Sequence, residues 1–338
     1  IFGPTKAAAQ LESSKAFSKA FMRRHGIPTA DYDTFTDPAA AHAFIDRLGA
    51  PIVIKADGLA AGKGVVVAMT LQEAHDAVDF MLVDNKYGVT HNEGGARVVI
   101  EQFLEGEEAS FIVLCDGKNV LALATSQDHK RLKDGDEGPN TGGMGAYSPA
   151  PVVTADVHAR AMREIILPTI RGMEKDGIPY TGFLYAGLMI DAKGHPKTLE
   201  FNCRMGDPET QPILMRLKSD LVDVLGAAVD GKLDQIELQW DRRTALGVVM
   251  AAHGYPESPR KGDTISGLPA EADDAVVFHA GTQLKDGVVS VTGGRVLCVT
   301  VLADSVKQAQ QRAYDVARGI HFEGAQYRRD IGFRAIKN

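Results

Sequence analysis

The spacing of apolar side chains divides the chain into helical and extended segments. Ala8, Leu11, Phe17, Phe21 and Met22 recur at helical intervals and predict one or two helices in the first 25 residues. Further helices are predicted at residues 37–48, 71–82, 156–173 and 305–318. Short apolar runs predict strands at residues 51–55, 65–68, 98–103, 184–191, 198–204, 247–252, 276–280 and 295–301, and a hairpin at residues 110–125.

This mixture predicts an α+β protein with more than one domain. A chain of 338 residues is long enough for two or three domains. After about residue 236 the pattern changes to short strands and one long helix, which indicates a separate α+β domain. The polar, glycine-rich residues 128–150 are predicted to form a long loop, and a loop of that length is usually functional.

Composition narrows the function classes without naming one. With 44 acidic against 37 basic residues, the net charge of −7 argues against a general nucleic-acid binder. The chain has no apolar stretch long enough to span a membrane, and we expect no signal peptide. Its three cysteines are far apart and form no CxxC pair, a pattern typical of reduced thiols. We therefore expect a cytoplasmic protein that binds neither nucleic acid nor membrane.

The first four residues, IFGP, have the pattern of a strand end that runs into a turn. We expect from this pattern that the chain is a fragment, or a truncated form of a longer protein.

One strand carries the strongest chemical pattern. Alternate side chains of a strand point to opposite faces, so residues 199–204 would present Glu200, Asn202 and Arg204 on one face and apolar side chains on the other. Carboxylate and amide oxygens are suitable magnesium ligands, and an arginine offers a planar fork for phosphate or carboxylate. A solvated strand face explains the same pattern. The sharp turn and helix expected after Arg204 favour a site at the end of a strand.

A glycine-rich segment follows the predicted strand at residues 51–55. It does not match the P-loop pattern, because Asp57 and Gly64 stand where glycine and serine or threonine are required. Lys55 at the end of the strand and Lys63 among the glycines instead suit a flexible flap that closes over polyphosphate. A plain β-turn with surface lysines is the alternative.

Two further segments carry weaker patterns. Residues 101–108 contain four acids in or just after a strand, which suits either solvated side chains or a hinge that meets a nucleoside. Asp128-His129-Lys130-Arg131 precedes a stretch so rich in glycine that close backbone approach to an anionic ligand is expected. Hydrolase chemistry is disfavoured, because the chain has no GxSxG nucleophile elbow.

These four segments, in this order, resemble the ATP-grasp ligases, and more specifically the phosphoribosylamine–glycine ligase family. The resemblance covers essentially the whole chain and includes the motif RMGDPE at residues 204–209, where the family usually has phenylalanine in place of Met205. It implies two α+β subdomains that grip ATP, followed by a C-terminal α+β domain. The expected boundaries are residues 1–35 for the remnant of an N-terminal domain with a linker helix, 36–104 for the flap subdomain, 105–235 for the larger subdomain and 236–338 for the C-terminal domain.

The resemblance also implies roles for individual residues. The residues expected to bind ATP are Lys15, Lys55, Gly58, Gly62, Lys63, Gly64, Glu101, Leu104 and Glu108. In this set the lysines and the flap glycines would meet the phosphates, Glu101 and the Leu104 backbone the adenine, and Glu108 the ribose. The remaining assignments are Glu200 and Asn202 for the metal, Asp128, Asn140, Thr141, Gly142, Gly143 and Arg204 for the substrates, and Arg204, Asp128 and Lys63 for catalysis.

The implied reaction joins glycine to phosphoribosylamine through glycyl phosphate in purine biosynthesis, with ATP and magnesium or manganese as cofactors. We expect a monomer whose partners are these small molecules. The family's N-terminal domain, which borders the phosphoribosylamine site, is expected to be absent. The alternatives are another ATP-grasp ligase or carboxylase, or a truncated ATP-binding fragment without ligase activity.

Overall fold

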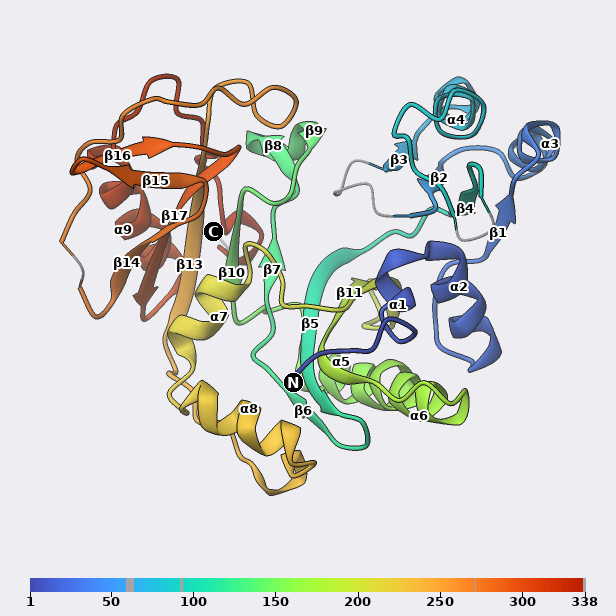
Figure 1. Cartoon of the computed structure of the whole chain (residues 1–338), viewed down its shortest axis with the longest axis horizontal. Helices are drawn as coiled ribbons and strands as arrows, with labels where there is room; N and C mark the ends of the chain where they lie inside the picture. The colour runs from blue at the N-terminus through green and yellow to red at the C-terminus, as the bar shows by residue number, and fades with distance from the viewer. Residues whose placement is uncertain (59–63, 92–93, 271, 337–338) are drawn as a thin grey trace. The chain divides into compact units, whose positions relative to one another are not determined.

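The computed structural model describes residues 1–58, 64–91, 94–270 and 272–336, and Figure 1 shows its elements. They fall into two compact units. The first unit comprises Ile1–Ala122, Val152–Arg204 and Leu225–Ile236, and the second Leu123–Pro151, Met205–Val224 and Glu237–Asn338. Each unit contains its own hydrophobic core, and each is described here by itself.

A small antiparallel sheet forms one part of the first unit. Its strands are β1 (Tyr32–Phe35), β2 (Ile52–Ala56), β3 (Val65–Ala68) and β4 (Val98–Gln102), in the order β1-β4-β2-β3. Helices α3 (Pro38–Leu48) and α4 (Leu71–Val78) pack on this sheet, and the π-helical turn η1 (Asp79–Val83) continues α4 (Figure 1). Asp37 caps α3, and Thr70 with Glu73 forms a capping box for α4.

A larger antiparallel sheet forms the rest of the first unit. Its order is β12-β11-β5-β6, with bounds β5 (Glu107–Asp116), β6 (Val120–Ala122), β11 (Thr181–Ile190) and β12 (Pro196–Asn202). The helical elements are α1 (Gln10–Ser13), α2 (Lys15–Arg24), α5 (Ala155–Arg160), η3 (Ala161–Ile166), α6 (Leu167–Lys175) and η4 (Leu233–Gln235). Apolar side chains of α1, α2 and the α5–η3–α6 helix form one core with β5 and β11.

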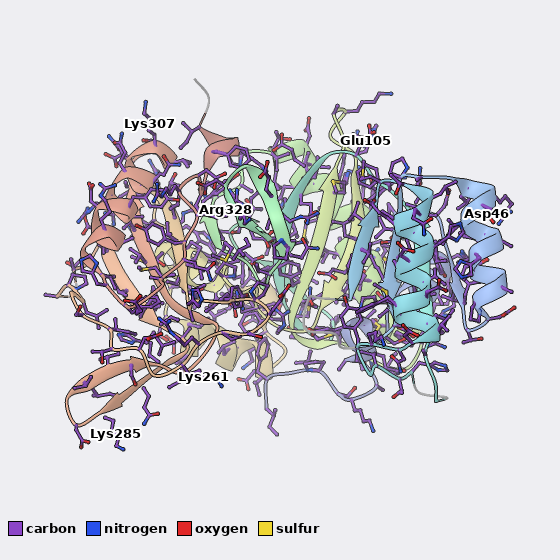
Figure 2. The ribbon with its side chains drawn as sticks, turned by 90° about the horizontal axis from the view of Figure 1, so that it is seen from above. Asp46, Glu105, Lys261, Lys285, Lys307 and Arg328 are labelled. Atoms are coloured by element: carbon purple, nitrogen blue, oxygen red, sulfur yellow. The ribbon has the colours of Figure 1, made fainter. Side chains whose placement is uncertain are left out.

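The second unit is built on a five-stranded sheet of order β14-β17-β13-β10-β7. Its elements are β7 (Gln127–Asp128), β8 (Arg131–Lys133), η2 (Asp134–Asp136), β9 (Glu137–Asn140), β10 (Gly145–Ser148), α7 (Thr210–Arg216), β13 (Thr244–Ala251), β14 (Ala275–His279), β15 (Thr282–Lys285), β16 (Val288–Val291), β17 (Arg295–Ala303), α9 (Val306–Gly319) and η5 (Phe333–Ala335). Helix α8 (Leu221–Val229) crosses the boundary between the units. The β15–β16 hairpin is a separate ribbon, and Lys285 at its turn points away from the unit (Figure 2).

The sequence pattern predicts most of these elements correctly. The helix expected at residues 156–173 is the continuous α5–η3–α6 segment, and the strand expected at residues 65–68 is β3. The long loop predicted at residues 128–150 is wrong, because this segment contains β7, β8, β9 and β10. Gly135, at φ +69°, allows the tight turn η2 between β8 and β9, and the sequence analysis did not recognise that turn. No helix within the described residues is long and apolar enough to cross a membrane.

The turn between β4 and β5 requires glycine. Gly106 has φ +154°, and a Cβ placed there would lie 2.3 Å from the carbonyl oxygen of Ile190. We expect Gly106→Ala to lower the free energy of unfolding by about 2–4 kcal/mol. As a control, Gly26→Ala, at φ +66° with no atom within 4 Å of the new Cβ, should cost about 1 kcal/mol. Urea denaturation of both variants tests this, and equal small losses would show that the turn relaxes.

Candidate active site

Two buried lysines share one buried glutamate in the first unit. Lys55 lies on β2, Glu101 on the neighbouring strand β4, and Lys19 on α2. The Lys55 ammonium pairs with one carboxylate oxygen of Glu101 and the Lys19 ammonium pairs with the other. Lys19 and Glu101 are 2 % exposed and Lys55 is 6 % exposed. We call this set the lysine–glutamate triad, and with all three groups ionised it has one net positive charge.

The charges of the triad affect one another's protonation. Burial lowers the pKa of Lys19 to about 8, although the neighbouring Glu101 carboxylate opposes this shift. Burial alone would raise the pKa of Glu101, but the Lys55 and Lys19 ammonium groups outweigh it and hold that pKa below its ordinary value. Glu101 is therefore ionised at neutral pH.

Hydrogen bonds connect the triad to strand β12. Lys19 Nζ donates to Thr29 Oγ1 over 2.7 Å, and the Thr29 hydroxyl donates to the carbonyl oxygen of Thr198 over 2.7 Å. Lys55 Nζ donates to the carbonyl oxygen of Leu199 at 3.3 Å. Both lysines are thus tied to the same short stretch of β12.

A β-bulge lies at this stretch. The register between β11 and β12 passes from Gly187 opposite Glu200 to Leu188 opposite Thr198, so Leu199 is the extra residue. The bulge turns the Leu199 carbonyl out of the regular ladder, where Lys55 can reach it. Glu200 follows directly, so the strand that carries the expected metal ligands is fixed to the phosphate-binding lysine expected from the sequence.

The polar face of β12 is arranged as the alternation predicts. Glu200 and Asn202 are half-buried and their side chains meet, with Asn202 Nδ2 3.5 Å from Glu200 Oε1. Arg204 donates to Asn202 Oδ1 at 3.4 Å and to Glu12 Oε1 at 3.2 Å. Phe201 on the opposite face is 2 % exposed. Two oxygen-bearing side chains and a guanidinium therefore lie in a row.

The first turn of α2 is fixed by a buried carboxylate. Asp57 accepts hydrogen bonds from the Ala16 N–H at 3.1 Å, from the Ser14 hydroxyl at 3.2 Å and from Arg97 Nε at 2.7 Å. Ser14 also caps the helix. Lys15, the first residue of α2, donates to the Gly58 carbonyl at 3.0 Å. Burial lowers the pKa of Lys15, while nearby Glu200 opposes the shift, so Lys15 also lies close to the polar face of β12.

The flap is described only at its two ends. Gly58 leaves β2 with φ +137°, and the Gly64 carbonyl accepts a hydrogen bond from the Ala56 N–H at 2.8 Å. Gly62 and Lys63, which were predicted to meet phosphate, lie outside the described residues.

The expected hinge lies between β4 and β5. Leu104 is half-buried and Glu108 is exposed at the start of β5. Both carboxylate oxygens of Glu101 pair with lysines of the triad. The contact between Glu101 and adenine that the sequence predicts would have to form beside these two ion pairs.

The remaining predicted substrate residues belong to the second unit. Asp128 is half-buried on β7, and Asn140 ends β9. Thr141 holds the following turn: its hydroxyl donates to the Lys130 carbonyl at 2.9 Å and accepts from the Gly143 N–H at 2.9 Å. The unit thus holds this predicted loop in one defined conformation.

Arg295 on β17 fastens the same loop to the RMGDPE segment. Its guanidinium donates to the Gly142 carbonyl at 2.7 Å and to Asp207 Oδ2 at 2.6 Å. A Cβ on Gly142 would lie 2.8 Å from the guanidinium carbon, and one on Gly143 would lie 2.3 Å from Pro208 Cδ. These glycines are therefore required by close packing. A pocket of about 220 Å³ opens beside Arg295 and Asp207.

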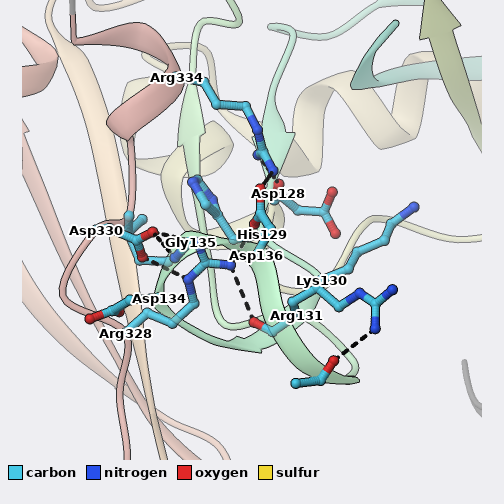
Figure 3. Close-up of polar contacts among 12 residues, drawn as sticks. Asp128, His129, Lys130, Arg131, Asp134, Gly135, Asp136, Arg328, Asp330 and Arg334 are labelled. Carbon is cyan, nitrogen blue, oxygen red and sulfur yellow. Dashed lines mark hydrogen bonds and ion pairs between the residues drawn. The ribbon is translucent and has the colours of Figure 1, made fainter. Parts of the chain in front are cut away.

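A buried arginine holds the hairpin β8–β9 to the end of the chain. Arg328 is 1 % exposed and makes a two-pronged pair with Asp330, with both N···O distances 2.7 Å. It also donates to Asp136 Oδ1 at 2.8 Å and to the Arg131 carbonyl. Figure 3 shows this cluster on one side of the hairpin, with the Asp128 and Lys130 side chains pointing to the other side.

His129 is completely buried and neutral. Its Nε2 accepts a hydrogen bond from the Gly332 N–H at 3.2 Å, so the ring proton lies on Nδ1. Burial lowers the pKa of His129 to about 3, and the positive charges of Arg334 and Arg328 act in the same direction. This histidine therefore has a structural role in the hairpin and is no acid–base group at neutral pH.

Sequence reasoning missed Lys19, Arg295 and Arg328. Lys19 stands one helical turn after Lys15, so the i, i+4 spacing places both on one face of α2 and could have indicated a second inward lysine. The two arginines carry no comparable helical spacing: Arg295 pairs with Asp207, 88 residues away, and Arg328 pairs with the nearby Asp330 but also with Asp136, 192 residues away. Within the described ranges there is no group of three or more His, Cys, Asp or Glu side chains that could hold a metal.

The fold and these residues define the class of protein. Two lysines near a glycine-rich strand pair, together with a carboxylate–amide strand in a neighbouring antiparallel sheet, form an ATP-grasp unit. The biotin carboxylase domain of the Hydrogenobacter thermophilus 2-oxoglutarate carboxylase has the same fold, with a TM-score of 0.72 over 96 % of this chain and 69 % of that one, at 19 % identity.

Closer similarity identifies the family. Residues 13–210 match the ATP-grasp (A) domain of phosphoribosylglycinamide synthetase, and residues 245–334 match its C domain. The phosphoribosylamine–glycine ligase of Ralstonia nicotianae is 74 % identical over 100 % of this chain and 79 % of its own length. The crystal structure of the Thermotoga maritima phosphoribosylamine–glycine ligase superposes with a TM-score of 0.88 at 39 % identity, over 98 % of this chain and 81 % of that one. The chain therefore belongs to the phosphoribosylglycinamide synthetase family.

The neutral state of His129 makes stability depend on pH. The pKa of the unfolded histidine is its ordinary value, about 6.5, and the pKa of the folded one is about 3. Between these values only the unfolded state binds the proton, so the free energy of unfolding falls as pH falls, by up to about 1.4 kcal/mol per pH unit. His129→Gln keeps an acceptor for Gly332 but does not titrate, so it should lose this part of the slope. Urea denaturation between pH 7 and 4 checks this, and identical slopes would contradict it.

Proposed function

We propose that this chain joins glycine to 5-phosphoribosylamine with ATP, forming glycinamide ribonucleotide, ADP and phosphate in purine biosynthesis. The observation that carries the proposal is the match to both domains of the phosphoribosylglycinamide synthetase family. The connection of Lys55 to β12, beside Glu200 and Asn202, supports it, since a ligase of this class must hold phosphate and metal together.

The first unit would bind the nucleotide. Lys15 and Lys55 would neutralise phosphate oxygens, and residues 58–64 would close over them. The Leu104 backbone would meet adenine and Glu108 the ribose. The contact between Glu101 and adenine stays a prediction. Because the Glu101 carboxylate lies between two ammonium groups, it would instead affect nucleotide binding by holding Lys55.

Glu200 and Asn202 fit a magnesium or manganese ion. They supply one carboxylate and one amide, the oxygen donors that such ions prefer, and both side chains lie half-buried at one place on β12. When bound, the ion would screen the repulsion between triphosphate and the incoming carboxylate. The related carboxylase structure contains MgADP, which supports ATP with a divalent metal as the cofactors.

Asp128, Arg204 and the loop Asn140–Gly143 would bind the two other substrates. Arg204 offers a fork for the glycine carboxylate. Gly142 is exposed, its N–H donates to the Tyr255 hydroxyl at 3.0 Å and its carbonyl accepts from Arg295, so these two side chains hold the loop in place for a substrate. Arg204 belongs to the first unit, whereas Asp128 and the loop belong to the second. That they bind the same substrates is part of the proposal.

The reaction would proceed in two steps. A carboxylate oxygen of glycine attacks the γ-phosphorus of ATP, the bond to the β-phosphate oxygen breaks, and ADP leaves. The amine of phosphoribosylamine then attacks the carbonyl carbon of glycyl phosphate, loses a proton and expels phosphate. Lys15, Lys55 and Arg204 act by charge neutralisation and orientation, and no protein nucleophile is needed.

Oxygen transfer tests this route directly. With glycine labelled by ¹⁸O in its carboxylate, one labelled oxygen should appear in the released phosphate, because the attacking oxygen stays on phosphorus. Mass spectrometry of phosphate measures it, and bicarbonate in place of glycine is the control for carboxylase chemistry. ADP release with bicarbonate but not with glycine would favour the carboxylase alternative, and unlabelled phosphate would exclude glycyl phosphate.

The metal assignment has its own test. Glu200→Gln or Asn202→Ala should lower kcat roughly a thousandfold or more, because losing one ligand removes several kcal/mol, in order of magnitude, of transition-state stabilisation. Lys193→Gln, at the turn between β11 and β12, is the matched control and should keep its activity. Thermal unfolding should be similar in all three variants. Near-normal turnover of either ligand variant at saturating magnesium would contradict the assignment.

A further inference from the structure

Lys19 has no part in the proposed function so far, yet it is as deeply buried as Glu101. We infer that Lys19 is a positioning residue for nucleotide binding: it neutralises Glu101 and thereby leaves the charge of Lys55 available to the phosphates of ATP. This inference rests on the proposed role of Lys55.

The charge balance of the triad carries the argument. Lys55 and Glu101 alone would form a neutral pair, and a carboxylate in direct contact with Lys55 would repel an incoming triphosphate. The second ammonium, on the other carboxylate oxygen, restores one net positive charge. Stability alone gives no reason for this arrangement, because burying a further charge costs free energy that a neutral pair would avoid.

The geometry of Lys19 gives it a second effect. Its ammonium lies between Glu101 and the Thr29 hydroxyl, which itself donates to the Thr198 carbonyl. Lys55 donates to the next carbonyl, that of Leu199. Lys19 and Lys55 therefore hold Glu101 and β12 at fixed positions together, and removing one ammonium frees the other to move.

The groups that face Lys19 come from three directions. Glu101 and Lys55 lie on the sheet side, Asp31 adds a weaker negative charge, and the Tyr32 ring centroid is 5.7 Å from Nζ. Burial dominates among these influences and brings the pKa of Lys19 to about 8. Because lysine is charged below its pKa, the triad loses its net charge as pH rises through about 8.

Nucleotide affinity is the first measurement. Lys19→Met keeps the apolar stem and removes the charge, so calorimetry at pH 7 should give a Kd for MgATP raised roughly tenfold or more. Lys6→Met, at an exposed position of the same unit, is the charge-matched control and should leave Kd unchanged. Lys55→Met should weaken binding at least as strongly as Lys19→Met.

The pH profile separates positioning from a merely structural role. In the wild type, kcat/KM for ATP should fall as pH rises through about 8, whereas Lys19→Arg stays charged and should hold its value to higher pH. Lys15 also has a lowered pKa, so the decisive quantity is the difference between these two profiles. If Lys19→Met does not fold, this comparison decides alone.

The outcomes distinguish this inference from the proposed function. Unchanged MgATP affinity in Lys55→Met would overturn the phosphate assignment itself. Weakened binding in Lys55→Met with normal binding in Lys19→Met would overturn the role of Lys19 only. Identical pH profiles for the wild type and Lys19→Arg would also overturn it.

Discussion

The site in the first unit depends on one carboxylate, Glu101, held between two ammonium groups in the protein interior. In such a medium, charges interact strongly and cannot be left unpaired. The triad therefore links α2, β2 and β4 through charged groups as well as through apolar packing. The hydrogen bonds from Lys19 and Lys55 extend this constraint to β12, where the β-bulge at Leu199 offers a carbonyl outside the regular ladder. The elements that we propose to bind phosphate and metal are thus connected to each other.

In the second unit, two arginine side chains hold a glycine-rich loop and the adjoining hairpin in place. Its loop at residues 140–143 contains two adjacent glycines, and glycine loses more conformational freedom on ordering than any other residue. Arg295 holds the loop by donating a hydrogen bond to the Gly142 carbonyl. Arg328 holds the adjoining hairpin by pairing with Asp136 and Asp330. A planar guanidinium with several donors suits this task, because it can bind a carboxylate and a backbone carbonyl at the same time.

Local sequence patterns predict an element correctly where the interactions that form it join near neighbours in sequence. The helices expected at residues 37–48 and 305–318 and the alternation of β12 follow from near neighbours in sequence, and the structure confirms them. The segment at residues 128–150 was misread because its strands are only two to four residues long. β8 pairs with β9 and β7 with β10 within the segment, and β10 also pairs with β13, about a hundred residues later. Its composition resembles a loop, and the pairing of β10 with β13 joins β7 and β10 to the five-stranded sheet.

The same distinction explains which site residues could be found. Glu200, Asn202 and Arg204 could be predicted as candidate site residues, because their spacing alone places them on one face of a strand. Lys19 looks like an ordinary amphipathic-helix lysine, and its i, i+4 relation to Lys15 shows only that both point the same way. Its importance depends on what lies opposite, an acid on β4 that already has one lysine partner. A residue that acts by balancing charge has no motif of its own, so it becomes visible only when the charges around a buried carboxylate are counted.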